Sequence, residues 1–186
     1  MMLRVRGFTL IELLIAVSIF VFLIMLAGPG YTEFMASHQI RNATDALLNG
    51  VQQTQGTAVR NNALARLVID PTTGTGGWQV FQTKDGTEVV APVQVYTVRD
   101  GAPKVKITLV PDDATQITFD GFGRVVANAD ASPTLTCLKV TNPSVSTSHP
   151  LNVALSGMGL GIGVGTKLCD PAVLSSEPQA CPAACK

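Results

Sequence analysis

The hydrophobic pattern at the start of the chain is one continuous apolar run. Residues 8–27 read FTLIELLIAVSIFVFLIMLA, and Glu12 is the only ionisable side chain among them. A helix of this length, rising about 1.5 Å per residue, spans the roughly 30 Å of a bilayer core. The run is therefore predicted to be a transmembrane helix. A carboxylate inside it costs about 2.5 to 3.5 kcal/mol on insertion scales, which implies a partner for Glu12.

The residues that flank this run decide its orientation. Arg4 and Arg6 lie just before it, and positive residues stay in the cytoplasm, so we expect everything after Pro29 on the other side of the membrane. A secretory signal peptide would end in a small-x-small cleavage site, which residues 25–30 fit poorly. A plain signal anchor fits better, but it gives no reason for Glu12.

A second helix pattern follows the apolar run. Gly28, Pro29 and Gly30 are expected to interrupt the helix, because proline lacks a hydrogen-bond donor and glycine loosens the backbone. A simple breaker at the membrane exit is the alternative. Spacings of three and four then predict an amphipathic helix from about residue 31 to about residue 62. Its apolar stripe consists of Ile40, Ala43, Leu47, Val51, Thr54 and Ala58. Gly50 and Gly56 cost about 1 kcal/mol each relative to alanine, so this helix is expected to depend on packing.

After Asn62 the pattern changes to a period of two, in β-branched and aromatic segments separated by turn residues. The predicted strands are Arg66–Ile69, Trp78–Gln82, Val93–Val98, Val105–Val110, Gln116–Phe119, Arg124–Val126, Thr134–Val140 and Leu151–Leu155. Turn signals lie at residues 70–77, 85–86, 100–101, 120–121 and 142–143. One helix backing short antiparallel strands predicts an α+β roll.

Composition predicts one globular head after the helix. The 186 residues, less the membrane segment, suffice for one ordinary domain. Charged residues make up 14% of the chain, below the roughly 25% usual in soluble proteins, which fits a membrane-tethered or assembled protein. The formal net charge is zero, whereas a general nucleic-acid-binding surface needs a basic excess.

Residues 6–14, RGFTLIELL, resemble the prepilin leader motif. In proteins with this motif, a membrane-embedded prepilin peptidase cuts after the glycine and methylates the new N-terminal phenylalanine. The resemblance implies cleavage between Gly7 and Phe8 and N-methylation of Phe8. It also implies that Glu12 pairs with the N-terminal amine of a neighbouring subunit, and that Pro29 is the proline that kinks the pilin helix. Two charges that are costly alone in lipid become tolerable when they are joined.

The second half of the chain is similar to a narrower group, the GspH/FimT-type minor pseudopilins. Residues 118–124, TFDGFGR, resemble that family's strand-turn-strand with its glycine pair. Residues 168–171 and 178–181, LCDP and PQAC, resemble its cysteine-bearing C-terminus, and residues 58–62 the end of its long helix. The chain is thus identified as a type IV pilin-like protein of the α+β class, with a long N-terminal helix packed on an antiparallel β-sheet head.

The resemblance implies four segments and a structural role. The segments are a leader peptide (1–7), a transmembrane helix (8–27), a kink with an amphipathic helix (28–62) and a β-rich periplasmic head with a cysteine-bearing tail (63–186). The implied function is that of a non-catalytic minor pilin or pseudopilin of a type IV pilus or a type II secretion pseudopilus, in filament assembly and in protein secretion or pilus biogenesis. The implied partners are other pilin subunits, prepilin peptidase, inner-membrane lipid and the assembly platform. The chain is expected to cross the bacterial inner membrane once, with its N-terminus in the cytoplasm.

No set of residues indicates catalysis, so we expect neither an enzyme nor a cofactor. Ser156 lacks the preceding glycine that a nucleophile elbow needs. His38 and His149 have no acidic neighbour close in sequence and are predicted to lie at the surface. Residues 157–165 alternate glycine with apolar side chains and fail the spacing of a dinucleotide site. As a strand they would have only glycine on one face, which gives a flat surface. This surface is either a contact for another subunit or simply a flexible edge.

The cysteines are Cys137, Cys169, Cys181 and Cys185. They contain no Cys-x-x-Cys pair and the predicted topology places them outside the cytoplasm, so disulfides are favoured over a four-thiolate zinc site and no metal is expected. Four cysteines allow three pairings. We prefer Cys169 with Cys181 and Cys137 with Cys185.

DNA capture for natural transformation is the alternative function. In some family members it is associated with an arginine-bearing G-R-x-R segment near the C-terminus. Residues 157–165 occupy that position here without an arginine, and Lys167 is the nearest cation. Phosphate contacts need Lys or Arg, so DNA is disfavoured as a partner. Arg99, Lys104 and Lys106 are interpreted as a solvated loop.

Overall fold

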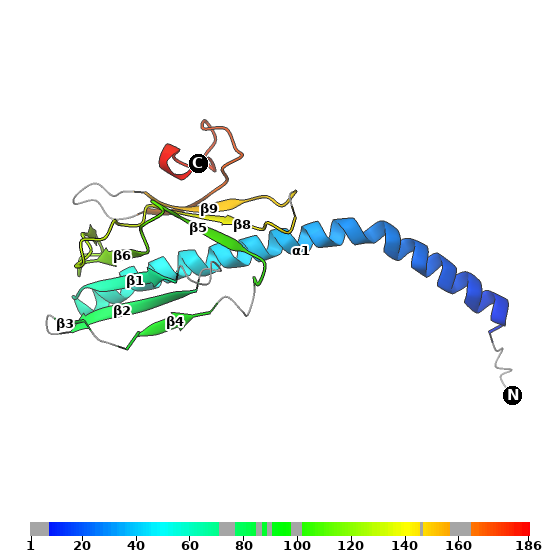
Figure 1. Cartoon of the computed structure of the whole chain (residues 1–186), viewed down its shortest axis with the longest axis horizontal. Coiled ribbons are helices and arrows are strands. Elements are labelled where there is room, and N and C mark those ends of the chain that lie inside the picture. The colour runs from blue at the N-terminus through cyan, green and yellow to red at the C-terminus, as the bar shows by residue number, and fades with distance from the viewer. Residues whose placement is uncertain are drawn as a thin grey trace, which may run out of the picture.

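The chain forms one long helix and a β-rich head (Figure 1). This computed structural model describes residues 8–70, 77–84, 87–88, 91–97, 102–145, 147–156 and 165–186. The helix α1 is Leu10–Asn61. The strands are β1 Ala65–Ile69, β2 Trp78–Lys84, β3 Thr87–Glu88, β4 Gln94–Tyr96, β5 Lys106–Val110, β6 Gln116–Phe119, β7 Val125–Val126, β8 Cys137–Thr141, β9 Leu151–Ser156 and β10 Gly165–Cys169. A 3-10 helix, η2 Ala183–Cys185, lies next to the C-terminus.

Helix α1 begins at a capped N-terminus. Thr9 has an extended backbone, and its Oγ1 accepts the backbone N–H of Glu12 at 3.3 Å. This bond satisfies one of the free donors of the first turn. Further along, the hydroxyl of Ser18 donates to the carbonyl of Leu14 at 2.8 Å. The polar groups of this apolar segment are therefore partly satisfied by the helix itself.

The helix bends where the sequence predicted an interruption. Helical structure continues through residues 28–30 and ends at Asn61, so these residues lie at a bend in one helix and do not end it. The parts Leu10–Met25 and Gly30–Asn61 meet at an angle of 47°. Pro29 lies in this interval, and its side chain, like those of residues 26–28, is outside the described part of the chain. Proline removes one amide donor, which bends a helix more readily than it ends it. No single straight helix among the described residues is long and apolar enough to cross a membrane. The two parts of α1 taken together are, by length and composition.

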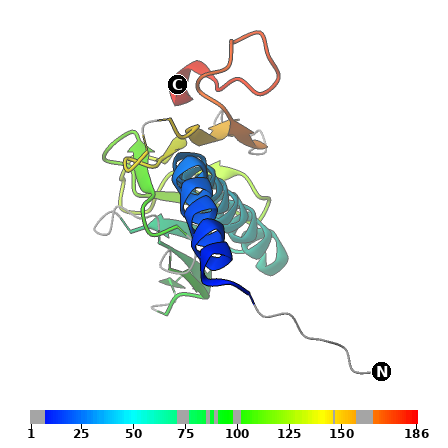
Figure 2. The ribbon, with the colours of Figure 1, turned by 90° about the vertical axis from the view of Figure 1, so that its right-hand side faces the viewer.

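The second part of α1 lies between two sheets, and its buried side is the stripe predicted from the sequence. Ile40, Ala43, Leu47, Val51, Thr54 and Ala58 are each no more than 2% exposed. The helix contacts β1 and β2 on one side and β8, β9 and β10 on the other, as the view along its axis shows (Figure 2). Burial of each large apolar side chain contributes about 1.5 to 3 kcal/mol. This packing offsets the cost of about 1 kcal/mol at each helical glycine.

The α+β class predicted from the sequence is confirmed, and the described part of the head contains two antiparallel sheets. The first has the order β3-β2-β1-β6-β7, with β4 also paired to β2. The second has the order β10-β9-β8-β5. The inner faces of both sheets and the buried stripe of α1 form one apolar core, in which Phe119, Leu67 and Leu138 are among the largest fully buried side chains.

The differences from the predicted strands have local causes. β3 has two residues, too few for an alternating pattern, and the burial of β10 does not alternate. The predicted strand at 134–140 starts only at Cys137, because Leu135 donates its N–H to Gln116 of β6 while Thr136 donates to Val110 of β5. Residues 134–136 therefore cross from one sheet to the other. The predicted turns at 85–86 and 100–101, and residues 71–76 of the first turn, lie outside the described residues.

Replacement of glycine by alanine is expected to have opposite effects at two positions of α1. A Cβ at Gly50 would lie 2.8 to 3.1 Å from three atoms of the Trp78 ring, which is 3% exposed and stacked on Tyr96. Gly50→Ala is therefore expected to destabilise the head by about 1 kcal/mol net, because overpacking outweighs the better helix propensity. Gly56 has nothing within 4 Å of the added Cβ, so Gly56→Ala is expected to stabilise the head by up to about 1 kcal/mol.

Urea titration with pulse proteolysis, applied to the full chain in detergent micelles, measures both effects. Gly56→Ala is the matched control, since it makes the same change in the same helix. Equal shifts of the two midpoints would contradict the packing argument.

Candidate assembly site

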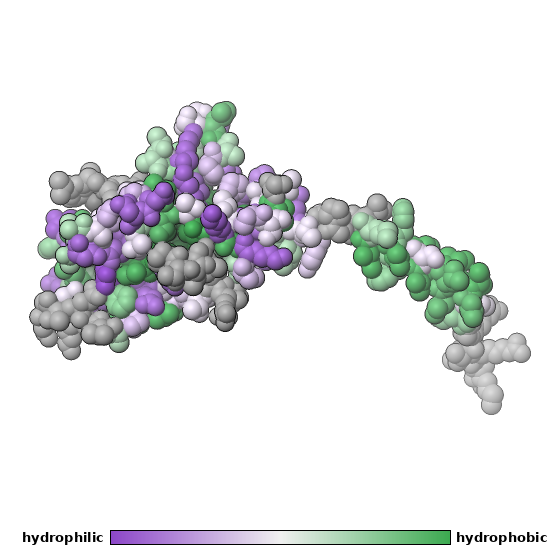
Figure 3. All heavy atoms as spheres, in the orientation of Figure 1, coloured by the Kyte–Doolittle hydropathy of each residue, from purple (hydrophilic) through white to green (hydrophobic). Residues whose placement is uncertain are grey.

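The first part of α1 projects from the head as an exposed apolar helix (Figure 3). The large apolar side chains from Phe8 to Met25 are between 46% and 84% exposed. A continuous surface this apolar is covered by lipid or by other apolar helices in a stable protein. Glu12 is exposed on the same segment. Of the predicted processing residues, Phe8 is the first described residue, and Gly7 lies outside the described part.

The turn at Asp120 closes the far end of α1. The Asp120 carboxylate accepts the backbone N–H groups of Phe122 and Arg124 at 3.0 and 2.9 Å, and the Arg124 guanidinium at 2.7 and 2.9 Å. The Gln55 side chain donates to the Gly123 carbonyl at 2.9 Å, which ties the turn to the helix. Partial burial raises the pKa of Asp120, but the hydrogen bonds from Arg124 and Phe122 outweigh it and hold the pKa below its ordinary value. Asp120 is thus a charged anchor for the turn at neutral pH.

This turn requires both of its glycines. Gly123 has a φ of +75°, in the left-handed region that side chains disfavour. A Cβ at Gly121 would lie 2.5 Å from the Asn62 side chain and 3.0 Å from two Asn62 backbone atoms. The glycine pair noted in the sequence therefore lets the turn lie directly against the end of α1. Phe122 between them is 78% exposed.

A polar network that sequence reasoning missed fixes residues 128–132 against the first sheet. The amide of Gln116 donates to both carboxylate oxygens of Asp130 at 2.7 and 2.8 Å, and its oxygen accepts from Arg66 at 2.5 Å. Ser132 donates to Asp130 through its backbone N–H and its hydroxyl, and these bonds hold the pKa of Asp130 below its ordinary value. The bonded side chains come from three separate segments of the sequence, so no local sequence motif indicates this network.

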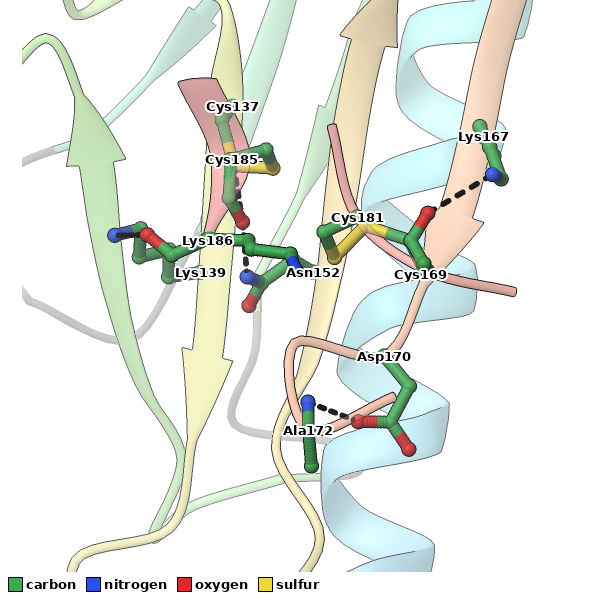
Figure 4. The surroundings of a disulfide bond; sticks show 11 residues. Cys137, Lys139, Asn152, Lys167, Cys169, Asp170, Ala172, Cys181, Cys185 and Lys186 are labelled. Atoms are coloured by element: carbon green, nitrogen blue, oxygen red, sulfur yellow. Dashed lines mark hydrogen bonds between the residues drawn. A yellow bond between two sulfur atoms is a disulfide. The ribbon is translucent and has the colours of Figure 1, made fainter. Parts of the chain in front are cut away.

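The C-terminal tail is fastened to the second sheet by two disulfides (Figure 4). The bonds join Cys137 to Cys185 and Cys169 to Cys181, with Cα atoms 5.4 and 4.9 Å apart. This is the pairing preferred from the sequence. Asn152 also donates to the carbonyl of Cys185 at 2.6 Å. Residues 170–186 are thereby held by covalent bonds and by side chains of the strands beneath them.

Thiol titration of the mature protein from an oxidising compartment is expected to find no reactive cysteine in the absence of reductant. All four cysteines are paired and nearly fully buried, and disulfides persist in such compartments. Urea-unfolded protein titrated with and without reductant is the control, because it exposes every sulfur. Two or more reactive thiols per folded chain would contradict the pairing.

The remaining candidate residues from the sequence are dispersed. His38 and His149 are exposed, as predicted, and His38 packs edge-on against Phe34 at 4.2 Å. Among the basic residues considered for nucleic acid, Lys167 donates to the Ala180 carbonyl at 2.9 Å, and Arg99 lies outside the described part of the chain. The glycine run likewise falls outside it up to residue 164, and Gly165 begins β10.

Two family models match this chain, one over most of the head and one over the N-terminal segment. A family model described as type II transport protein GspH matches residues 43–159, which include the buried stripe of α1 from Ala43 onward and the turn at Asp120. The chain belongs to the GspH family. A second model, the prokaryotic N-terminal methylation motif, matches residues 2–28. The GspH-family chain thus carries the N-terminus of a membrane-anchored pilin, and pilin-family proteins are structural rather than catalytic.

A solved structure shows the same fold. The type IV minor pilin FimU of Pseudomonas aeruginosa, in one crystal form, is 16% identical with a TM-score of 0.50, over 66% of this chain and 86% of that chain. In a second crystal form the values are 13% and 0.49, over 68% and 91%. A comparison with curated proteins gave no match. The likeness to the first crystal form supports the long helix and antiparallel sheets of a type IV pilin fold.

Proposed function

We propose that this GspH-family protein is a minor pilin or pseudopilin, a non-catalytic subunit of a type IV pilus or of a type II secretion pseudopilus. In this proposal prepilin peptidase cuts between Gly7 and Phe8 and methylates Phe8. The mature chain crosses the inner membrane once with its head in the periplasm. Other pilin subunits and the inner-membrane assembly platform then take it into a filament.

The observation that carries the proposal is the exposed apolar helix with one carboxylate near its start. Its side chains from Phe8 to Met25 are exposed, while the continuation of the same helix is buried between the two sheets of the head. The first part of α1 is thus free to pack against lipid or other helices without disturbing the head. A subunit that moves from membrane to filament needs this separation.

Glu12 supplies a means of fixing how subunits join. It lies four residues after Phe8, which corresponds to about 6 Å along a helix. A carboxylate in an apolar layer needs an opposite charge, and the amine that cleavage creates at Phe8 of a second subunit provides one. Pairing the two charges would fix the axial offset between adjacent helices.

Intact-mass analysis tests the first step of the proposal. The membrane-extracted chain is expected to begin at Phe8 and to carry one added methyl group, and the same mature species is expected in filaments sheared from cells. Gly7→Val is expected to leave the precursor uncut and absent from filaments, because a branched side chain then stands at the cleaved bond. A conservative change two residues before it, Val5→Ile, controls for expression. A mature N-terminus at any other residue would remove the main support for a pilin.

A further inference from the structure

Sulfur atoms from both disulfides gather at one place under the C-terminal tail (Figure 4). The Sγ atoms of Cys169, Cys181 and Cys185 all lie within 4.8 Å of one another. Cys137 is bonded to Cys185, so its sulfur adjoins the same group. The four cysteines are no more than 4% exposed, and together with Ala154 they form a buried cluster of their own.

The distance between the two disulfides is close to the sulfur–sulfur spacing of a four-thiolate metal centre. Zinc–sulfur bonds of about 2.3 Å place the sulfurs of a tetrahedral site about 3.8 Å apart. In the oxidised chain Cys169 is bonded to Cys181 and Cys137 to Cys185, and the Cys185 sulfur lies within 4.8 Å of the Cys169 and Cys181 sulfurs. Once both bonds are reduced, rotation about the Cα–Cβ bonds brings the four sulfurs to the spacing of such a site. We propose that the chain, while its cysteines are still thiols, binds one thiophilic divalent cation such as Zn²⁺ through these four sulfurs.

The surroundings of the cluster suit a structural site. Lys167 donates to the carbonyl of Ala180, the residue before Cys181, and Lys139 donates to the carbonyl of Lys186, the residue after Cys185. Four thiolates around one divalent cation carry a net negative charge, and these two lysines bring positive charge to the backbone beside Cys181 and Cys185. Cations beside a thiol favour its thiolate form. Nearly complete burial leaves no open coordination position, as in structural rather than catalytic zinc sites.

The two states of the cysteines then hold the tail in the same place. A newly made chain carries thiols, and the bound ion fastens residues 170–186 to the second sheet. When a thiol–disulfide oxidant of the compartment takes two electrons from each pair of thiolates, two S–S bonds form and the ion is released. The oxidised chain has no thiolate left to bind metal.

Zinc titration of the full chain in detergent micelles, without oxygen and after removal of the reductant, tests the site. The reduced chain is expected to bind one Zn²⁺ in competition with a chromophoric chelator, and the oxidised chain none. The variants C137S/C185S and C169S/C181S each keep one pair of cysteines. Each is expected to bind zinc more than about 100-fold more weakly, because loss of two direct ligands exceeds the 10- to 100-fold effect of outer-shell changes.

Limited proteolysis of the same samples separates a folded site from loose chelation. Zinc is expected to protect the tail of the reduced chain from cleavage as fully as oxidation does. The proposal is overturned if the reduced chain binds no zinc, or if either double variant binds as tightly as the parent. It is also overturned if zinc binds while the tail stays as sensitive to protease as in the metal-free reduced chain.

Discussion

A Glu12→Leu subunit is expected to be inserted and cut normally but to reach sheared filaments at less than about a tenth of the normal level. Without the carboxylate, the N-terminal amine of the neighbouring subunit stays unpaired in lipid, at a cost of about 2.5 to 3.5 kcal/mol. A cost of about 1.4 kcal/mol already corresponds to a tenfold change in an equilibrium constant. Insertion is expected to improve slightly, since the apolar run loses its only ionisable side chain. Immunoblots of membrane and filament fractions measure both quantities.

The size of the effect separates pairing from a purely local role. Glu12 also lies in the first turn of α1, where a carboxylate stabilises a helix by about 0.3 to 1 kcal/mol. Loss of that contribution alone would lower incorporation by less than about tenfold. Ser18→Ala is the control, because it removes a polar group that is satisfied by Leu14 within the same helix. If the Glu12→Leu subunit entered filaments at the normal level, the pairing role would be wrong.

The helix could be predicted in detail because its burial follows a local rule. The positions from Ile40 to Ala58 that recur at three and four residues are all buried between the two sheets, with Thr44 and Thr57 buried beside them. The spacing that places residues on one side of a helix does not depend on what they pack against. The N-terminal motif is equally local, and the family model for it matches within residues 2–28.

The arrangement of the head could not be predicted in this way, because it depends on contacts between distant segments. Residues 134–136 alternate like a strand, yet Leu135 and Thr136 bond to different sheets. Gln55 reaches Gly123, 68 positions later, and Asn152 holds the carbonyl of Cys185. In sequence these side chains resemble ordinary surface residues. Only the assembled fold shows which of them fasten the turn and the tail.

Gly121→Ala is expected to lower the free energy of unfolding of the head by more than about 2 kcal/mol. The added Cβ would meet the Asn62 side chain at 2.5 Å and the Asn62 Cα and carbonyl carbon at 3.0 Å. Asn62 cannot move away freely. It ends α1 in a left-handed conformation, with φ at 46°, and its N–H is bonded to carbonyls of the last helical turn. The opposite side of the contact is fixed as well, because the Asp120 carboxylate holds the turn through three groups of Phe122 and Arg124.

Urea unfolding of the full chain in detergent micelles, followed by the fluorescence of its single tryptophan, Trp78, measures this loss. Gly56→Ala makes the same change where nothing lies within 4 Å and is expected not to destabilise. Asn62→Gly supplies a second test, since glycine keeps the left-handed backbone while removing the side-chain oxygen. In the Gly121→Ala background it is expected to restore part of the stability, and the two backbone contacts account for the remainder. Strictly additive effects of the two substitutions would mean that residues 62 and 121 are not in contact. The turn would then pack against the end of α1 without the close approach of Gly121 to Asn62.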